Sequence, residues 1–149
     1  ITEVSVNLFS LAARSALHPD EAGAAIDDIE ESKGLRAKEF VALQDPGKDF
    51  NDSAVKLSTR LKMFQQLWAV YGDQLFVNLH RMVRQEKPQF SSVQDRMAYF
   101  MRKTSQIAGE DLSTFYKNWG FQADPSVYAG IKALHLPPPK REPSAEFKG

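Results

Sequence analysis

Residues 57–71 read LSTRLKMFQQLWAVY, and this stretch carries the clearest structural pattern in the chain. Its apolar side chains recur at steps of four, three, four and three residues, namely Leu57, Leu61, Phe64, Trp68 and Tyr71. This spacing places them on one face of an α-helix. Three residues that favour helix N-caps stand at positions 51–53, and Gly72 predicts the end of the helix. The sequence therefore predicts a helix with one face turned to a core.

Capping residues, prolines and glycines divide the sequence downstream into four more predicted helices, at about residues 73–87, 91–108, 111–119 and 124–136. Ser91 and Gln94 have the spacing of a capping box at the start of the second of these. Upstream, apolar residues at helical spacing predict helices over 2–18 and 20–33, whereas 35–44 fits either an extended segment or a short helix. We expect an all-α fold, a compact helical bundle with short connections.

The character of the chain changes after Leu136. Pro137, Pro138 and Pro139 open a polar segment that runs to Gly149. Such composition is typical of an extended tail or a linker. We therefore expect a helical domain over residues 1–136 and a Pro-rich tail or linker over residues 137–149.

The composition narrows the classes of function. Lys and Arg together number 19, as do Asp and Glu, so the formal net charge is zero and nothing favours a nucleic-acid partner. No apolar run approaches the roughly 20 residues that cross a bilayer, so we expect no transmembrane segment. The chain has no cysteine, which excludes disulfides, thiol catalysis and cysteine-ligated zinc.

The residues that could bind a metal form no complete site when the sequence is considered alone. His18, His80 and His135 are far apart, and none stands in an H-E-x-x-H pattern, so we interpret them as structural. The acidic stretch 20–31 lacks the ligand spacing of a calcium loop and is interpreted as a solvated face. Three aspartates surround the Pro-Gly turn at 46–47, where turn and cap roles are favoured over calcium binding.

The aromatic residues of the predicted helices allow two interpretations. They fall at helical spacing, at positions Trp68, Tyr71, Phe100, Phe115, Tyr116 and Trp119. Packing in a core is the favoured interpretation, and a substrate platform built from one or two of them is the alternative. Taken alone, these residues support a soluble helical domain and nothing more specific.

Three segments resemble the enhancin-like zinc metallopeptidases, peptidase family M-sixty. ITEVSVNLFSL at 1–11 resembles the family's glutamate-bearing helix, and FQQLWAVYG at 64–72 resembles its downstream helix that ends in Tyr-Gly. LSTFYKNWGF at 112–121 is similar to its late element with an aromatic pair followed by Trp-Gly. Order and spacing agree over roughly residues 1–135.

The resemblance implies a gluzincin site, in which H-E-x-x-H supplies two histidines and a catalytic glutamate and a later glutamate is the third zinc ligand. By resemblance, Glu3 is this metal ligand. Asn7 follows four residues later on the same helix face and is expected to orient a ligand by a hydrogen bond. Because the chain contains no H-E-x-x-H, we expect no catalytic residue in this fragment, no bound metal and no activity on its own.

The resemblance also implies the place of this chain in a larger protein, the location of that protein and its partners. The chain would be the C-terminal subdomain of the catalytic domain of a zinc metalloendopeptidase, secreted or in the bacterial cell envelope. Its partners would be the N-terminal part of that domain and a mucin-type, O-glycosylated protein substrate. The alternative hypothesis is a non-catalytic helical module that binds protein or carbohydrate through exposed aromatic residues.

The gene upstream of Ile1 distinguishes these two hypotheses. If the chain continues a peptidase domain, an H-E-x-x-H motif is encoded within about 30 residues before Ile1, because both histidines must meet Glu3 at one zinc ion. Reading the genomic sequence ahead of this position is the measurement. An upstream region without the motif favours the binding module.

Overall fold

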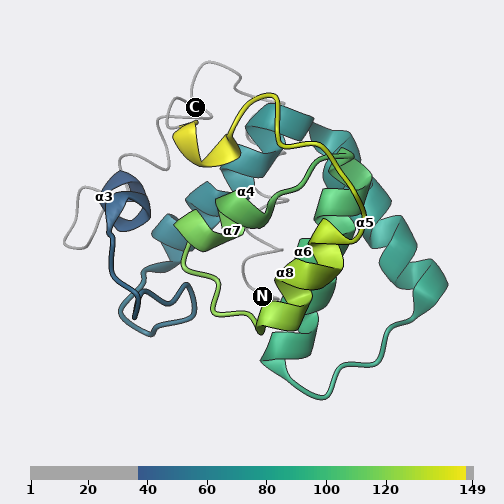
Figure 1. Cartoon of the computed structure of the whole chain (residues 1–149), viewed down its shortest axis with the longest axis horizontal. Helices are drawn as coiled ribbons and strands as arrows, with labels where there is room; N and C mark the ends of the chain where they lie inside the picture. The colour runs from purple at the N-terminus through teal and green to yellow at the C-terminus, as the bar shows by residue number, and fades with distance from the viewer. Residues whose placement is uncertain (1–36, 147–149) are drawn as a thin grey trace.

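The structure, a computed structural model, describes residues 37–146 (Figure 1). The predicted helices at 2–18 and 20–33 lie outside this range. Within it the chain forms only helices, so the predicted all-α fold is confirmed. These are α3 (Ala37–Ala42), α4 (Leu57–Tyr71), α5 (Asp73–Glu86), α6 (Val93–Ala108), α7 (Ser113–Asn118), α8 (Pro125–Lys132) and the 3-10 helix η1 (Pro143–Ala145).

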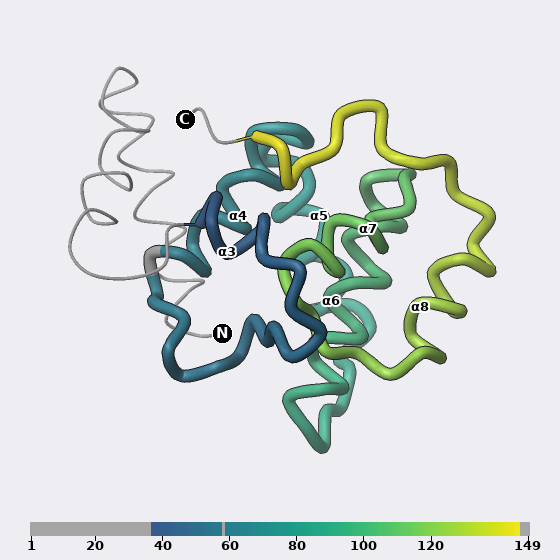
Figure 2. Tube along the Cα trace, turned by 60° about the vertical axis from the view of Figure 1, so that its left-hand side comes forward, coloured from purple at the N-terminus to yellow at the C-terminus, as the bar shows by residue number. Residues whose placement is uncertain are grey.

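The long helices α4, α5 and α6 pack in sequence order. α4 contacts α5, α5 contacts α6, and α8 packs on the far side of α6. The short helices α3 and η1 both contact α4, and α7 contacts η1 (Figure 2). Although α7 is only six residues long, its Phe115 and Tyr116 are buried.

The centre of the core is the segment around α7. Leu112, Phe115, Tyr116 and Trp119 are all fully buried. The Trp119 ring lies 5.9 Å from the ring of Phe40 in α3. Tyr116 lies between α7 and α6, where its hydroxyl contacts that of Thr104. Because aromatic side chains bury large apolar areas, this short helix links more of the fold than its length suggests.

Two predicted helix starts are wrong by a few residues. α4 begins at Leu57 with no side-chain cap, because the proposed caps serve the preceding turns: Asp52 accepts a hydrogen bond from the Ala54 N–H at 2.8 Å. The capping box of α6 uses Ser92 and Asp95, one residue later than predicted. The error at α6 arises because adjacent residues can cap the same helix, and packing selects among them.

Other local predictions are confirmed. Asp124 caps α8 by accepting a hydrogen bond from the Ser126 N–H, and Pro125 occupies the first turn. Gly109 ends α6 in the left-handed conformation. The ambiguous stretch 35–44 contains the short helix α3.

The segment after Leu136 runs along the bundle and ends against α4 (Figure 2). It contains no helix or strand until Pro143, where η1 begins. Pro143 and Ser144 are buried, and the Asn118 side-chain amide donates to the Ser144 hydroxyl at 2.9 Å. Near the start of the segment, the Pro137 carbonyl accepts from the Asp111 N–H at 2.7 Å.

The turn after Trp119 requires glycine for two reasons. Gly120 has a φ of +67°, which side chains other than glycine rarely adopt. A Cβ atom there would lie 2.8 Å from Cγ and 2.9 Å from the carbonyl oxygen of Lys48. The Gly120 carbonyl also accepts from the Phe50 N–H at 2.9 Å, which keeps the two segments together.

Gly120→Ala is therefore expected to destabilise the protein more than Gly109→Ala. Gly109 has a matching φ of +68°, but a Cβ atom added there would meet no other atom within 4 Å, so its substitution tests conformation alone. We expect Gly109→Ala to lower the free energy of unfolding by about 1–2 kcal/mol. Gly120→Ala should lower it further because the Lys48 backbone must move. Urea unfolding followed by circular dichroism measures both, and equal losses would contradict the close approach.

Candidate functional site

The predicted zinc ligand Glu3 and its predicted partner Asn7 lie outside residues 37–146. Between those limits, no group of three or more histidine, cysteine, aspartate or glutamate side chains is arranged to hold a metal ion. The described helices can therefore contribute to a site in ways other than metal binding.

The aspartates around the Pro-Gly turn serve the backbone. Asp45 accepts from the Gly47 N–H at 2.7 Å, and Asp49 accepts from the Asn51 N–H at 2.8 Å. With the similar bond at Asp52, all three carboxylates hold turns. The interpretation as turn and cap residues is confirmed.

Lys48 stabilises the ends of two helices. Its ammonium group lies within hydrogen-bonding distance of four backbone carbonyls, those of Phe40, Val41, Leu43 and Asn118, at 3.2, 3.1, 2.9 and 2.8 Å. Carbonyls at helix C-termini lack partners and carry partial negative charge, so a cation there is favourable. Burial lowers the pKa of Lys48, and Asp45 opposes this effect. No local sequence pattern indicates this role.

The Tyr-Gly pair at the end of α4 has a structural role. The Tyr71 hydroxyl donates to the Glu110 carboxylate at 2.8 Å, and Glu110 also accepts from the Lys140 N–H at 3.3 Å. Burial and then Glu110 raise the pKa of Tyr71 well above its usual value. Gly72, with a φ of +69°, lets α5 begin directly after α4. This pair thus connects α4, the end of α6 and the C-terminal segment.

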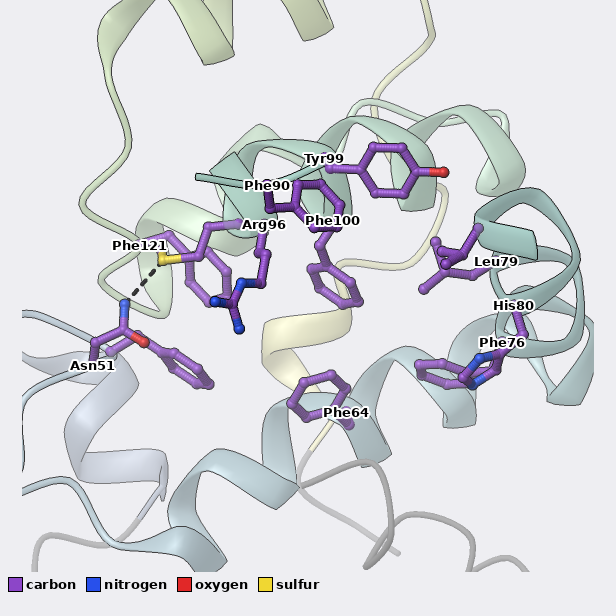
Figure 3. A pocket seen from close by; sticks show the side chains of 13 residues that line it. Asn51, Phe64, Phe76, Leu79, His80, Phe90, Arg96, Tyr99, Phe100 and Phe121 are labelled. Carbon is purple, nitrogen blue, oxygen red and sulfur yellow. Dashed lines mark hydrogen bonds between the residues drawn. The ribbon is translucent and has the colours of Figure 1, made fainter. Parts of the chain in front are cut away.

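A concavity lies between α4, α5 and α6, and we call it the α4–α6 groove (Figure 3). Its volume is about 250 Å³. It is lined by Phe50, Asn51, Phe64, Phe76, Leu79, His80, Val83, Phe90, Arg96, Met97, Tyr99, Phe100 and Phe121. Aromatic rings from three helices meet in it, because Phe64 lies 6.4 Å from Phe76 and 5.6 Å from Phe100.

Polar groups are few in this groove. The Asn51 amide contacts the Met97 sulfur at 2.9 Å, and Figure 3 shows the Arg96 side chain extending from α6 towards the space above Phe64. His80 lines the groove from α5. Such a lining can receive apolar side chains but contains no nucleophile paired with a base.

Tyr99 at the edge of the groove belongs to a small polar network. Its hydroxyl donates to Glu86 at 3.0 Å, and Lys103 forms an ion pair with the other Glu86 oxygen at 2.6 Å. Burial, followed by Glu86, raises the pKa of Tyr99 to about 12. Hydrogen bonds from Lys103 and Tyr99 lower the pKa of Glu86. The network joins the end of α5 to α6.

Comparison with known proteins identifies the class of the chain. The family model described as "Peptidase M60, enhancin and enhancin-like" matches residues 1–120. A crystal structure of a functionally unknown conserved protein from Bacillus anthracis str. Ames is similar, with 32% identity and a TM-score of 0.60. The similarity covers 72% of this chain and 23% of that protein, so the chain spans less than a quarter of its length. No curated protein matches.

The helical fold and these matches define a metallopeptidase-related domain. The chain belongs to the Peptidase M60, enhancin and enhancin-like family, which confirms the family predicted from three short segments. The matched range contains Glu3, Asn7 and both aromatic-glycine pairs. The groove was not predicted, because sequence periodicity does not show which apolar residues remain uncovered.

The Tyr99–Glu86 contact predicts a shifted alkaline titration. In the unaltered protein Tyr99 should ionise near pH 12, whereas an ordinary tyrosine ionises at about 10. Since folding raises this pKa, the associated stability is complete below about pH 10 and is lost as the pH rises through about 12. Glu86→Gln should lower the pKa of Tyr99 part of the way, because burial remains.

Tyrosinate absorbance measured against pH tests this shift. The same Glu86→Gln change in a Tyr99→Phe background is the matched control and should leave the titration of the other tyrosines unchanged. An identical shift in both backgrounds would assign the effect to another tyrosine.

Proposed function

We propose that the intact protein is a zinc metalloendopeptidase and that this chain is the C-terminal helical subdomain of its catalytic domain, over residues 1–136, followed by the Pro-rich tail at 137–149. The observation that carries the proposal is the family match over residues 1–120. That range begins with the segment in which Glu3 and Asn7 stand.

Glu3 would be the third ligand of the zinc ion, and Asn7 would orient a ligand from one helical turn away. A catalytic zinc site needs three protein ligands and an open position for water, whose pKa the metal lowers. A single carboxylate does not meet this need, and residues 37–146 supply no further ligand cluster. The histidine pair would come from the preceding part of the domain, so the chain alone would be inactive and free of metal.

The described helices would form a rigid wall behind this site. The packing of the motif residues supports this: Trp119 is fully buried, and the Tyr71 hydroxyl donates a hydrogen bond to Glu110. A wall built from such contacts would hold an attached ligand helix in a fixed position, as catalytic geometry requires.

The family match supports a proposal for the substrate class and the location. Mucin-type O-glycosylated proteins would be the substrate, and the enzyme would be secreted or part of the bacterial cell envelope. None of the helices between residues 37 and 146 has the length and apolar character that a membrane span requires.

The alternative function, a protein- or carbohydrate-binding module, has one structural feature in its favour, the α4–α6 groove. A platform built from Phe115, Tyr116 or Trp119 is not available, because all three are fully buried. Of the other candidate residues, Phe100 lines the groove, whereas Trp68 is half-buried and lies outside it.

Glu3→Ala in the full-length protein tests the peptidase proposal. Loss of the ligand should abolish cleavage of a mucin-type glycoprotein and reduce the zinc content, while the helical circular dichroism stays unchanged. Asn7→Ala should lower activity or zinc affinity by roughly 10- to 100-fold, as expected for a residue that orients a ligand.

Glu21→Ala is the matched control, since Glu21 lies in the acidic stretch and no role in the site is assigned to it. It should retain both zinc and activity. Full proteolysis by the Glu3→Ala protein would remove Glu3 from the site.

A further inference from the structure

The α4–α6 groove leaves apolar surface uncovered by residues 37–146. Val83, which lines it, is 37% exposed. Aromatic side chains from α4, α5 and α6 surround the same space (Figure 3). Contiguous exposed apolar surface of this kind marks a place where another segment or molecule packs.

The size of the groove favours side chains over a small-molecule ligand. Its volume of about 250 Å³ lies below the roughly 300–1,000 Å³ of pockets that hold drug-sized ligands. It exceeds the roughly 150 Å³ of a protein cavity that admits a benzene ring. About two large apolar side chains would fill it. An amphipathic helix presents its anchoring side chains in this way.

Residues 4–16 of this chain have the pattern that such an occupant needs. Val4, Leu8, Leu11, Ala12 and Ala16 recur at the spacing of one helix face. The largest of them, Leu8 and Leu11, are adjacent on that face. Two leucines match the number of side chains that the groove accommodates.

The chain can reach the groove from its first described helix. Phe40 of α3 lies 5.9 Å from Trp119, and Trp119 lies 6.3 Å from Phe50, which lines the groove. The 20 residues from 17 to 36 connect α3 with the amphipathic stretch. Even a fully helical connection of this length spans about 30 Å, and an extended one spans up to about 66 Å.

The charges of the two parts are complementary. Residues 1–36 contain seven acidic and three basic side chains, whereas residues 37–149 contain twelve acidic and sixteen basic ones. Arg96 lines the groove itself. The acidic stretch 20–31 would therefore be attracted to the part of the chain that carries the groove.

We infer that residues 4–16 dock as an amphipathic helix in the α4–α6 groove, with Leu8 and Leu11 inside it. The docked helix would hold its first turn, including Glu3, beside α4–α6. That last consequence rests on the proposed peptidase function, whereas the docking itself does not.

The chain has no cysteine, so Val83→Cys introduces one thiol into the groove for labelling. In the otherwise unaltered chain, the docked helix should protect this thiol from a maleimide reagent. Adding Leu8→Asp and Leu11→Asp should speed labelling by about tenfold or more, because charged side chains disfavour the apolar groove. Ser10→Asp is the matched control: Ser10 is on the opposite helix face, so labelling should stay slow.

Disulfide trapping tests the same contact without the aspartates, in case those variants fail to fold. Leu8→Cys or Leu11→Cys combined with Val83→Cys should close under mild oxidation, whereas Ser10→Cys with Val83→Cys should remain open. Equal labelling in all backgrounds would overturn the inference, because the groove would then be open or covered by a second copy. Equal disulfide trapping of Ser10→Cys and the two leucine variants would overturn it as well. Neither readout needs zinc, so failure here is distinct from failure of the Glu3 test.

Discussion

The side-chain amide of Gln66 is the constraint on which the packing of this domain depends. Its oxygen accepts from the Trp119 indole at 2.8 Å, and its nitrogen donates to the Glu146 carbonyl at 2.9 Å and the Ser144 carbonyl at 3.4 Å. Gln66 is almost completely buried, and a buried polar group without partners costs about 1–3 kcal/mol. Its bonds are satisfied only when α4, the end of α7 and the η1 segment meet, so the three elements are coupled.

Much of the helical architecture could be predicted from the sequence, because helical spacing and helix-ending residues are local. The helix at residues 57–71 and the stops at Gly72 and Gly109 are examples. The predicted inner face of this helix is wrong: Met63 and Leu67 are fully buried, whereas Leu57 is 40% exposed. The cap of α6 was misplaced by one residue, since neighbouring side chains compete for the same role, and α4 has no side-chain cap. The contact of Lys48 with Asn118 could not be predicted, because the two residues are 70 positions apart in the sequence. The contact of the buried Ser144 with Gln66 could not be predicted either, because 78 positions separate them.

Only part of the candidate site could be predicted from the sequence. Glu3 and Asn7 stay predictions from family resemblance, since no local pattern distinguishes a zinc-binding glutamate from one at the start of an ordinary helix. The aromatic-glycine pairs that carry the same resemblance serve packing: Trp119 binds Gln66, and Tyr71 binds Glu110. In this part of the chain, the family pattern therefore reflects the requirements of the fold.

The four carbonyls around the Lys48 ammonium group have a consequence for chemical modification. An ammonium group has three N–H donors and a full charge, whereas an acylated lysine is neutral and has one N–H donor. Acylation of Lys48 would leave most of these carbonyls without a partner and break its bond to Asn118, whereas the Phe50–Gly120 bond would still connect the two segments. Amine-reactive cross-linkers that acylate Lys48 would therefore alter the contacts of the segment that they probe. Their results should be compared with those of reagents directed at carboxylates.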